Sequence, residues 1–581
     1  MLPDMMRKPF IALVLIVLGL NATAQKMTTL FETSGGKQTP EYKDIISWWQ
    51  RLDQASPLVT MKTMGMTDAG YPLHLVIVSN GSFTGFKEAH NQKKTVLLIN
   101  NGIHPGEPDG IDASMLLVRD IVEKKTALPN NIILAIIPVY NIGGCLNRSA
   151  YYRIDQDGPE AFGSRGNSQG LDLNRDFIKC DSKEAFAFAE IFHQADPDIF
   201  IDNHVSNGAD YQHIMTLLAS QHNKLGGKMG EYMNKQFEPA LYSLMKKEGY
   251  DLIPYVNDFG ENVTDGWNEF WDSPRYSSGY ASLFQTFAFV PETHMLKPYS
   301  LRVKATYALM KSFISFARDN GLQLQELRKE ARKEVISATR FASSYKVDSS
   351  AATTITFKGF EAVRKKSAVS GLPRLFYDRT KPFTKQIPFY NQYTIQSYAT
   401  KPRAYIIPQG WWKVIDRLNA NKIIMRPLGR DSTIKVEAYY ITKFRSAATP
   451  YQAHHANTNV EVERKEQTLT FRKGDWLIPM NQEGNRFLME TLEPYFEDSY
   501  FSWNFFDGIL NNMEGYSAYH YEDIAAADVE KDPELKRLLE QKRAADTSFA
   551  HSASAQLSFI FNHSLFKDPN YMRYPVFRIN E

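Results

Sequence analysis

The chain has 581 residues, of which 43% are hydrophobic and 23% are charged. This composition is typical of a globular protein, and the length predicts about two to four domains. The formal net charge of +2 excludes a strongly basic surface, so we expect no nucleic-acid partner.

Residues 1–24 have the pattern of a signal peptide. Arg7 and Lys8 give a positive start, an apolar run covers Phe10–Leu20, and small residues at 22–24 form a cleavage pattern. The apolar run is shorter than the ~20 residues that a membrane-spanning helix needs, so we predict cleavage rather than anchoring. We therefore expect an exported protein, periplasmic or secreted, without a membrane span.

The next part of the chain alternates predicted strands and helices. Continuous apolar runs predict buried strands, and helical spacing of apolar residues predicts the amphipathic helices between them. This alternation favours an α/β fold with a mixed, mostly parallel sheet flanked by helices. We predict a helix over Pro40–Arg51, strands over Leu73–Val78 and Thr95–Asn100, a helix over Ile111–Lys124 and a strand over Asn131–Tyr140.

Histidine and glutamate residues follow the predicted strands. His104 and Glu107 lie in a Pro/Gly loop after Thr95–Asn100, His204 ends a strand, and Glu292 lies where a later strand stops. Ligands of open α/β sheets bind beyond the carboxyl ends of strands, so these four side chains should lie together. The remaining predictions are a functional loop over Asn141–Asp172, helices over Lys183–Gln194 and Met229–Glu248, and strands over Asp198–His204, Tyr211–Leu217 and Gln285–Val290.

The second half of the chain has a different character. A long helical stretch, Tyr299–Ser344, is followed by alternating apolar segments with many aromatic residues and few clear helices before Pro533–Ala545. We place a domain boundary near residue 345, with a first domain over residues 25–345. Residues 346–581 should form an accessory domain, mixed or β-rich, that packs on the first domain and borders its cleft.

Only two cysteines are present, Cys145 and Cys180. They could form one disulfide bond, or both could be small buried side chains. Neither has the spacing of a metal-binding pair, so a metal site would have to use histidine and carboxylate ligands.

Four short motifs follow one another along the chain. They are His104-Pro105-Gly106-Glu107, Leu171-Asp172-Leu173-Asn174-Arg175, the isolated His204, and Phe289-Val290-Pro291-Glu292-Thr293. Over roughly residues 41–309, this pattern resembles the zinc carboxypeptidase family of metallocarboxypeptidases. Two histidines and one carboxylate leave a fourth zinc position open, as catalytic zinc sites do.

The resemblance implies a role for each residue. One zinc ion per chain would be bound by His104, Glu107 and His204, and Glu292 would act as general acid and base. Arg153 lies where the family has the arginine that stabilises the oxyanion, although Arg148 and Arg165 share its loop. The remaining roles are binding of the substrate carboxylate by Asn174 and Arg175, and orientation of His104 by Asp172.

We therefore predict a zinc-dependent metallocarboxypeptidase that hydrolyses the C-terminal bond of peptide substrates. The alternatives are an amidohydrolase of the same fold that acts on muropeptides or acylated amino acids, and a non-catalytic peptide-binding protein on a peptidase scaffold. The family also has a mobile tyrosine over the substrate, for which Tyr276 and Tyr280 are both candidates. Side-chain preference and oligomeric state are not indicated by the sequence.

Overall fold

The computed structural model describes residues 27–580 except 82, 259, 261 and 262. The predicted signal peptide lies outside the described residues. Among these residues, no helix combines the length and the hydropathy needed to cross a membrane.

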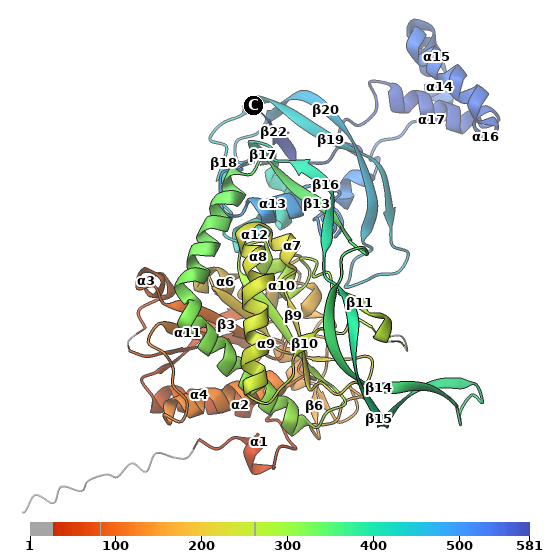
Figure 1. Cartoon of the computed structure of the whole chain (residues 1–581). Helices are drawn as coiled ribbons and strands as arrows, with labels where there is room; N and C mark the ends of the chain where they lie inside the picture. Colours follow the sequence, from red (N-terminus) through yellow and green to blue (C-terminus); the bar gives the residue numbers. More distant parts are fainter. Residues whose placement is uncertain (1–26, 82, 259, 261–262, 581) are drawn as a thin grey trace, which may run out of the picture.

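The first half of the chain forms a nine-stranded sheet (Figure 1). Its order is β1-β2-β4-β3-β7-β12-β9-β10, with β8 paired to β12. The central strands β4, β3, β7 and β12 are parallel, whereas β1, β2 and β9 join antiparallel. The strands are β1 (Val59–Met66), β2 (Pro72–Ser79), β3 (Thr95–Asn100), β4 (Ile132–Ile137), β7 (Ile199–Asp202), β8 (His204–Ser206), β9 (Met215–Ala219), β10 (Ile253–Pro254) and β12 (Phe287–His294).

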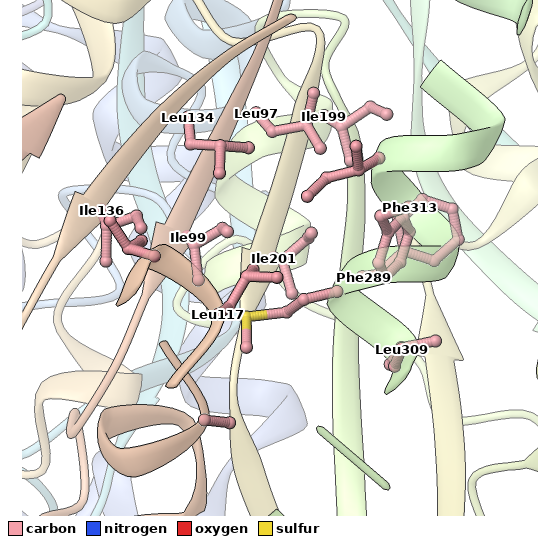
Figure 2. Close-up of a cluster of buried hydrophobic side chains, with 14 of the residues drawn as sticks. Leu97, Ile99, Leu117, Leu134, Ile136, Ile199, Ile201, Phe289, Leu309 and Phe313 are labelled. Carbon is pink, nitrogen blue, oxygen red and sulfur yellow. The ribbon is translucent and has the colours of Figure 1, made fainter. Parts of the chain in front are cut away.

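Helices cover both faces of this sheet. Every residue of β3 and β4 is buried, and successive side chains alternate between the two faces. Leu97, Ile99 and Ile201 pack with Leu117 and Phe313 on one face (Figure 2). The helices of that face are α2 (Tyr42–Ala55), α4 (Asp109–Val122), α8 (Gly227–Tyr232), α9 (Glu238–Lys247) and α11 (Tyr299–Ser337), whereas α3 (Phe86–Asn91), α6 (Lys183–Ala195) and α10 (Ser277–Ser282) contribute to the core of the opposite face. The predicted α/β class is therefore confirmed.

The connections change direction between β3 and β7. From β3 the chain passes through α4 to β4 on one side, and from β4 it passes through α6 to β7 on the other side of β3. A crevice forms beyond the carboxyl ends of strands at such a switch point, because the two loops leave in opposite directions. His104 lies in the loop that follows β3, and His204 begins β8 directly after β7.

The second half is β-rich but contains more helices than the sequence indicated. It has a six-stranded antiparallel sheet of order β18-β21-β17-β22-β19-β20, in which β22 lies between β17 and β19. These strands are β17 (Ala404–Ile407), β18 (Arg426–Pro427), β19 (Ser432–Ser446), β20 (Asn457–Phe471), β21 (Trp476–Pro479) and β22 (Phe577–Ile579). Helices α12 (Trp412–Ala420) and α13 (Asn485–Leu492) extend the core of the α6 face, so the two halves share one buried cluster.

Two further pieces leave this body (Figure 1). Strands β14 (Thr353–Lys366) and β15 (Pro373–Tyr390) form a long hairpin, to which β11 (Trp267–Asn268) adds at the base. The second piece is a projecting bundle with its own core, made of α14 (Ala518–Lys531), α15 (Pro533–Ala545), α16 (Thr547–Ala550) and α17 (Ala553–His563).

Several predicted element boundaries were wrong. The strand predicted to begin at Tyr211 begins at Met215, and the helix predicted to reach Ser344 ends at Ser337. Residues 340–347 instead form β13 (Arg340–Val347), which pairs with β16 (Tyr393–Thr400). Glu292 lies inside β12 rather than after its end, because β12 continues alongside β8 to His294.

Candidate active site

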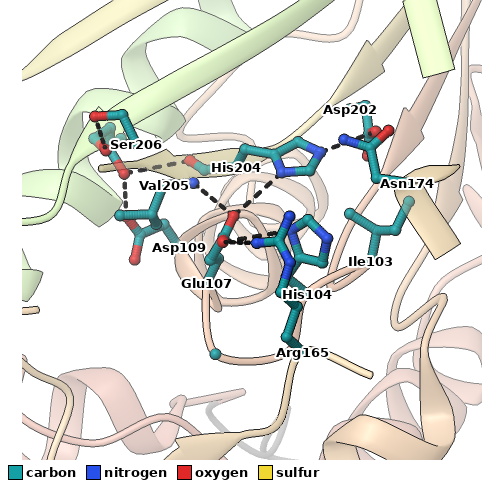
Figure 3. Close-up of polar contacts among 12 residues, drawn as sticks. Ile103, His104, Glu107, Asp109, Arg165, Asn174, Asp202, His204, Val205 and Ser206 are labelled. Carbon is teal, nitrogen blue, oxygen red and sulfur yellow. Dashed lines mark hydrogen bonds and ion pairs between the residues drawn. The ribbon is translucent and has the colours of Figure 1, made fainter. Parts of the chain in front are cut away.

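The two histidines are held in the same way. Nε2 of His104 lies 2.8 Å from Oδ1 of Asp172, and Nε2 of His204 lies 3.0 Å from Oδ2 of Asp202. Each Nδ1 therefore points to the side on which Glu107 lies, at 3.3 Å from His104 and 3.1 Å from His204 (Figure 3). A carboxylate behind an imidazole fixes the ring and leaves its other nitrogen free to bind a metal.

Glu107 is anchored between these rings. One carboxylate oxygen accepts a hydrogen bond from the backbone N–H of Val205 at 2.8 Å, and the other lies 2.6 Å from Nη1 of Arg153. Burial alone would raise the pKa of Glu107, but the positive charges on Arg153 and His104 lower it well below its usual value. The carboxylate is therefore ionised at neutral pH.

The strands explain why the histidines meet. Asn100 at the end of β3 pairs in register with Asp202 at the end of β7, and its side-chain amide donates to Asp202 at 2.9 Å. The loops that follow start from neighbouring points, so His104 and His204 converge, with ring centroids 4.9 Å apart. Gly106 permits the close approach of Arg153 to this loop, because a Cβ atom there would lie 2.8 Å from the Arg153 side chain.

These three side chains fit a zinc ion. One ligand atom from each of His104, Glu107 and His204 lies within 4.8 Å of the others, and all three residues are at most 4% exposed. Nδ1 of His104 is buried without a hydrogen-bond partner, which is costly unless something binds it. The pKa of His204 is raised well above its usual value, since Asp202 outweighs the effect of burial. Zinc would take the place of that proton, because metal ligands must be deprotonated.

Glu292 faces the same space from β12. Its Cα position is paired with that of His204 on β8, and its side chain lines a pocket of about 270 Å³ together with His104, Glu107 and His204. Burial in this pocket, together with the negative charge of Glu107, raises the pKa of Glu292 to about 8. A carboxyl group with a pKa near the working pH can both accept and release a proton.

The two candidate arginines differ in position. Arg153 is fully engaged, since Nε donates to Gln156 at 2.7 Å, Nη1 contacts Glu107, and Nη2 donates to Asn207 at 3.2 Å. Arg153 does not line the Glu292 pocket, whereas Arg165 does. Nε of Arg165 lies 2.9 Å from Asp172, and Nη1 lies 3.6 Å from Glu107.

Asn174 and Arg175 also line the pocket. Nη1 of Arg175 donates to the carbonyl oxygen of Asn174 at 2.8 Å, and its guanidinium lies 4.5 Å from the centroid of the Tyr276 ring. Tyr276 lines the pocket. Tyr280 instead is fully buried, and its hydroxyl donates to Asn421 at 2.6 Å. Of the two tyrosines, Tyr276 is therefore the one placed to contact a ligand.

Comparison with known proteins agrees with this geometry. A sequence model of the zinc carboxypeptidases, Peptidase_M14, matches residues 45–218. Over this segment the chain resembles the zinc carboxypeptidases. The match indicates a metallopeptidase, and the family that this segment resembles is zinc-dependent.

The individual relatives are distant. The protein called Carboxypeptidase 2 in Trichophyton rubrum is 21% identical over 434 residues, which cover 72% of this chain and 75% of the relative. The same coverage and identity hold for Carboxypeptidase 2 of Trichophyton equinum. The crystal structure of a metallo-carboxypeptidase from Burkholderia cenocepacia overlaps 48% of this chain and 70% of its own, with 18% identity and a TM-score of 0.37.

Some residues of this candidate site were missed from the sequence. Asp202 was not assigned to His204, although residues two apart on an extended segment point to the same side. Tyr451 and Gln452 also reach the site, and no local pattern indicated them. The Tyr451 hydroxyl lies 2.9 Å from Nε of Arg175, and the Gln452 side chain accepts from the backbone N–H of Asp172 at 2.8 Å.

The cysteines take no part in this centre. Cys145 and Cys180 are both free and buried, so the second of the two alternatives applies. Burial raises the pKa of each thiol to about 12, which keeps both protonated and unreactive.

Proposed function

We propose that the protein is a zinc-dependent metallocarboxypeptidase that hydrolyses the C-terminal peptide bond of peptides. One observation carries the proposal. A single pocket is lined by the His104-Glu107-His204 cluster, by Glu292 and by Arg175. Three candidate ligands for one metal ion lie in the same small space as a carboxyl group and a guanidinium group. This combination suits a substrate that ends in a free carboxylate.

We assign one zinc ion per chain to His104, Glu107 and His204. When bound, zinc supplies a Lewis acid that lowers the pKa of a water molecule towards ~7. The chain's own contribution is rigidity, since Asp172 and Asp202 hold the two rings from behind. This support fixes which nitrogen of each ring faces the ion.

Glu292 is assigned as the group that moves the proton. It takes a proton from the attacking water and delivers it to the nitrogen of the leaving amino acid. The raised pKa of about 8 supports this role, because the carboxyl group must exist in both protonation states during one turnover.

The negative charge that develops on the substrate's carbonyl oxygen requires a hydrogen-bond donor that is permanently charged. Arg153 remains the candidate that the resemblance implies, but Arg165 is the better supported one, because it lines the pocket and Arg153 does not. We propose that Arg165 stabilises the oxyanion and that Arg153 positions Glu107 through its contact at 2.6 Å.

Arg175 is assigned as the anchor of the substrate's terminal carboxylate, with Asn174 beside it. A planar guanidinium can make two parallel hydrogen bonds to a carboxylate, and it is held in place here by Asn174 and the Tyr276 ring. We further propose that the protein is exported to the periplasm or secreted, on the signal-like pattern of residues 1–24, and that residues 346–581 are an accessory domain.

Exchange of Glu292 for glutamine tests the mechanism. Glu292→Gln keeps the shape of the side chain but removes the base, so kcat for release of a C-terminal amino acid should fall about 10²- to 10⁴-fold. Zinc content, measured by atomic emission, should not change. Glu490→Gln is the matched control, because Glu490 is also buried, has a pKa raised to about 7 and does not line the pocket. Unchanged hydrolysis in Glu292→Gln would refute the assignment.

A further inference from the structure

The proposed catalytic pocket extends beyond the groups that the mechanism uses. Val290 lies two residues before Glu292 on β12, so both side chains point to the same side of the strand. Leu218 of β9 pairs in register with Val290, and both residues line the pocket. At about 3.3 Å per residue, this pair lies roughly 7 Å from Glu292 along β12. Val290 and Leu218 therefore give the pocket an apolar floor next to the reaction centre.

Two serines of α10 line the same pocket. Ser277 lies beside Asn174, since its backbone N–H donates to Oδ1 of Asn174 at 3.3 Å. Ser278 lies beside the end of β9, because its carbonyl oxygen accepts a hydrogen bond from the hydroxyl of Ser220 at 3.4 Å. Strand β9 runs away from Glu292 towards this end, so Ser278 lies beyond the apolar floor.

Both serine hydroxyls are buried and unpaired. Ser277 is 0% exposed and Ser278 is 1% exposed, and neither Oγ atom has a hydrogen-bond partner within the described part of the chain. Ser282 of the same helix does not line the pocket, and its Oγ donates to the carbonyl oxygen of Gly279 at 2.7 Å. A buried hydroxyl without a partner costs free energy, and a ligand in the pocket that bonds to it would remove this cost.

Aromatic rings border another side of the pocket. Phe270 and Tyr276 line it with their ring centroids 5.0 Å apart, and the Tyr255 ring lies 6.1 Å from that of Phe270. The Tyr276 ring also contacts the guanidinium of Arg175. When Arg175 holds the carboxylate of a C-terminal residue, the side chain of that residue therefore enters a space with apolar walls and two hydroxyl groups.

We propose that this pocket selects a C-terminal residue whose side chain has an apolar body and a neutral hydrogen-bonding tip, with tyrosine preferred. Ser277 and Ser278 are the specificity-determining residues, because their hydroxyl groups bind that tip. The proposal rests on the carboxypeptidase function stated above and specifies its substrate class. A serine hydroxyl can both donate and accept, so a phenol or a carboxamide at the tip can satisfy it.

The discrimination is between side chains of similar shape. Phenylalanine fills the same space as tyrosine but leaves the hydroxyls of Ser277 and Ser278 unpaired after it has displaced water. A site that hydrogen-bonds a substrate hydroxyl rejects the analogue without it more strongly than an apolar pocket distinguishes one methylene group. The same argument favours glutamine over methionine, which has a similar length but only a weak acceptor.

The first test compares peptides that differ only in the C-terminal residue. We expect kcat/KM for release of tyrosine to exceed that for phenylalanine about 10- to 100-fold, and glutamine to be preferred over methionine. Equal values within each pair, or the opposite order, would overturn the inference. Absence of release from every peptide would instead refute the proposed function.

Serine variants locate the preference in the pocket. Ser277→Ala and Ser278→Ala should each lower kcat/KM for tyrosine about 5- to 20-fold and should not lower it for phenylalanine. Ser282→Ala is the control from the same helix and should keep the wild-type ratio of the two substrates. An equal loss with both substrates in the Ser277 and Ser278 variants would show a structural role and overturn the inference.

Thermal unfolding of the free enzyme tests the unpaired hydroxyls without any substrate. Removal of an unpaired hydroxyl breaks no hydrogen bond, so Ser278→Ala should keep or raise Tm. Ser282→Ala removes the bond to the carbonyl oxygen of Gly279 and should lower Tm. A fall in Tm in Ser278→Ala as large as that in Ser282→Ala would mean that the Ser278 hydroxyl is already bonded, and it would overturn the inference.

Discussion

At the scale of single residues, the site is organised by pairs of unlike groups. His104 with Asp172, and His204 with Asp202, each place a carboxylate behind a ring. The sequence motifs were sufficient to nominate both histidines, Glu107 and Glu292, because each follows or ends an apolar strand. They were insufficient for the arginines, since a loop of irregular sequence contains several and only its path decides which one reaches the pocket.

Substitution of Arg165 and substitution of Arg153 should have different effects. Arg165→Gln should lower kcat about 10²- to 10³-fold with zinc content unchanged, because it removes a donor to the developing negative charge. Arg153→Gln should chiefly weaken zinc binding, about 10- to 100-fold, because it frees Glu107. Steady-state kinetics and zinc titration against a competing chelator measure the two effects.

The opposite result would restore the role that the family resemblance gives to Arg153. In that case Arg153→Gln would lose kcat at saturating zinc, and Arg165→Gln would not. Arg148→Gln is a suitable control, since Arg148 shares the loop but donates to the backbone carbonyls of Pro40, Thr39 and Ala161.

At the scale of elements, those defined by their local sequence were predicted, and those that depend on contacts with distant residues were not. The buried strand Thr95–Asn100 was predicted with its observed bounds, because its six residues are apolar or β-branched except for the last. The end of α11 was missed because nothing at Ser337 resembles a helix stop. The following residues form β13 by pairing with β16, whose partner residues lie 46 to 60 positions later, and no local pattern indicates such a partner.

The loop between β19 and β20 is another long-range element. It turns at Gln452 and Ala453, both with positive φ (51° and 64°), which is an unfavourable conformation for residues other than glycine or asparagine. The turn places Tyr451 against Arg175, Gln452 against the backbone of Asp172, and His454 within 2.8 Å of Asp181. Strain in a turn that reaches the pocket indicates a functional constraint.

Tyr451→Phe should weaken substrate binding without slowing the chemistry. The substitution removes the hydroxyl that holds Nε of Arg175, so the guanidinium is less well oriented towards a carboxylate. We expect KM to rise about 2- to 12-fold, the equivalent of ~0.5 to 1.5 kcal/mol, with kcat nearly unchanged. Tyr398→Phe is the control, because Tyr398 is also half-exposed and does not line the pocket. A fall in kcat with constant KM would contradict this positioning role.

At the scale of the whole molecule, the two halves contribute to one site. The sequence predicted a second domain and its contact with the first, but not that α12 and α13 continue the core of the α6 face. Side chains so far apart in the sequence form one buried cluster only in the assembled fold. The candidate ligands likewise come from the ends of two central strands, so a bound ion would join distant parts of the chain.

Zinc should therefore stabilise the whole protein. Because His104, Glu107 and His204 converge only in the folded state, zinc at a free concentration a thousandfold above its Kd should add about 4 kcal/mol to the free energy of unfolding. Scanning calorimetry of chelated protein, with and without added zinc, measures the shift in Tm. His104→Ala should show almost no shift, and an equal shift in that variant would place the stabilising ion elsewhere.

The position of β22 imposes an order on biosynthesis. Phe577–Ile579 inserts between β17 and β19, and Arg578 within it contacts Glu493 and Glu437. On the ribosome, the neighbouring strands emerge long before the one that joins them, and the α14–α17 bundle emerges in between. The antiparallel sheet can thus close only after the α14–α17 bundle has been synthesised, and a chain that lacks Phe577–Ile579 keeps an open seam in which Glu437 and Glu493 have lost their arginine partner.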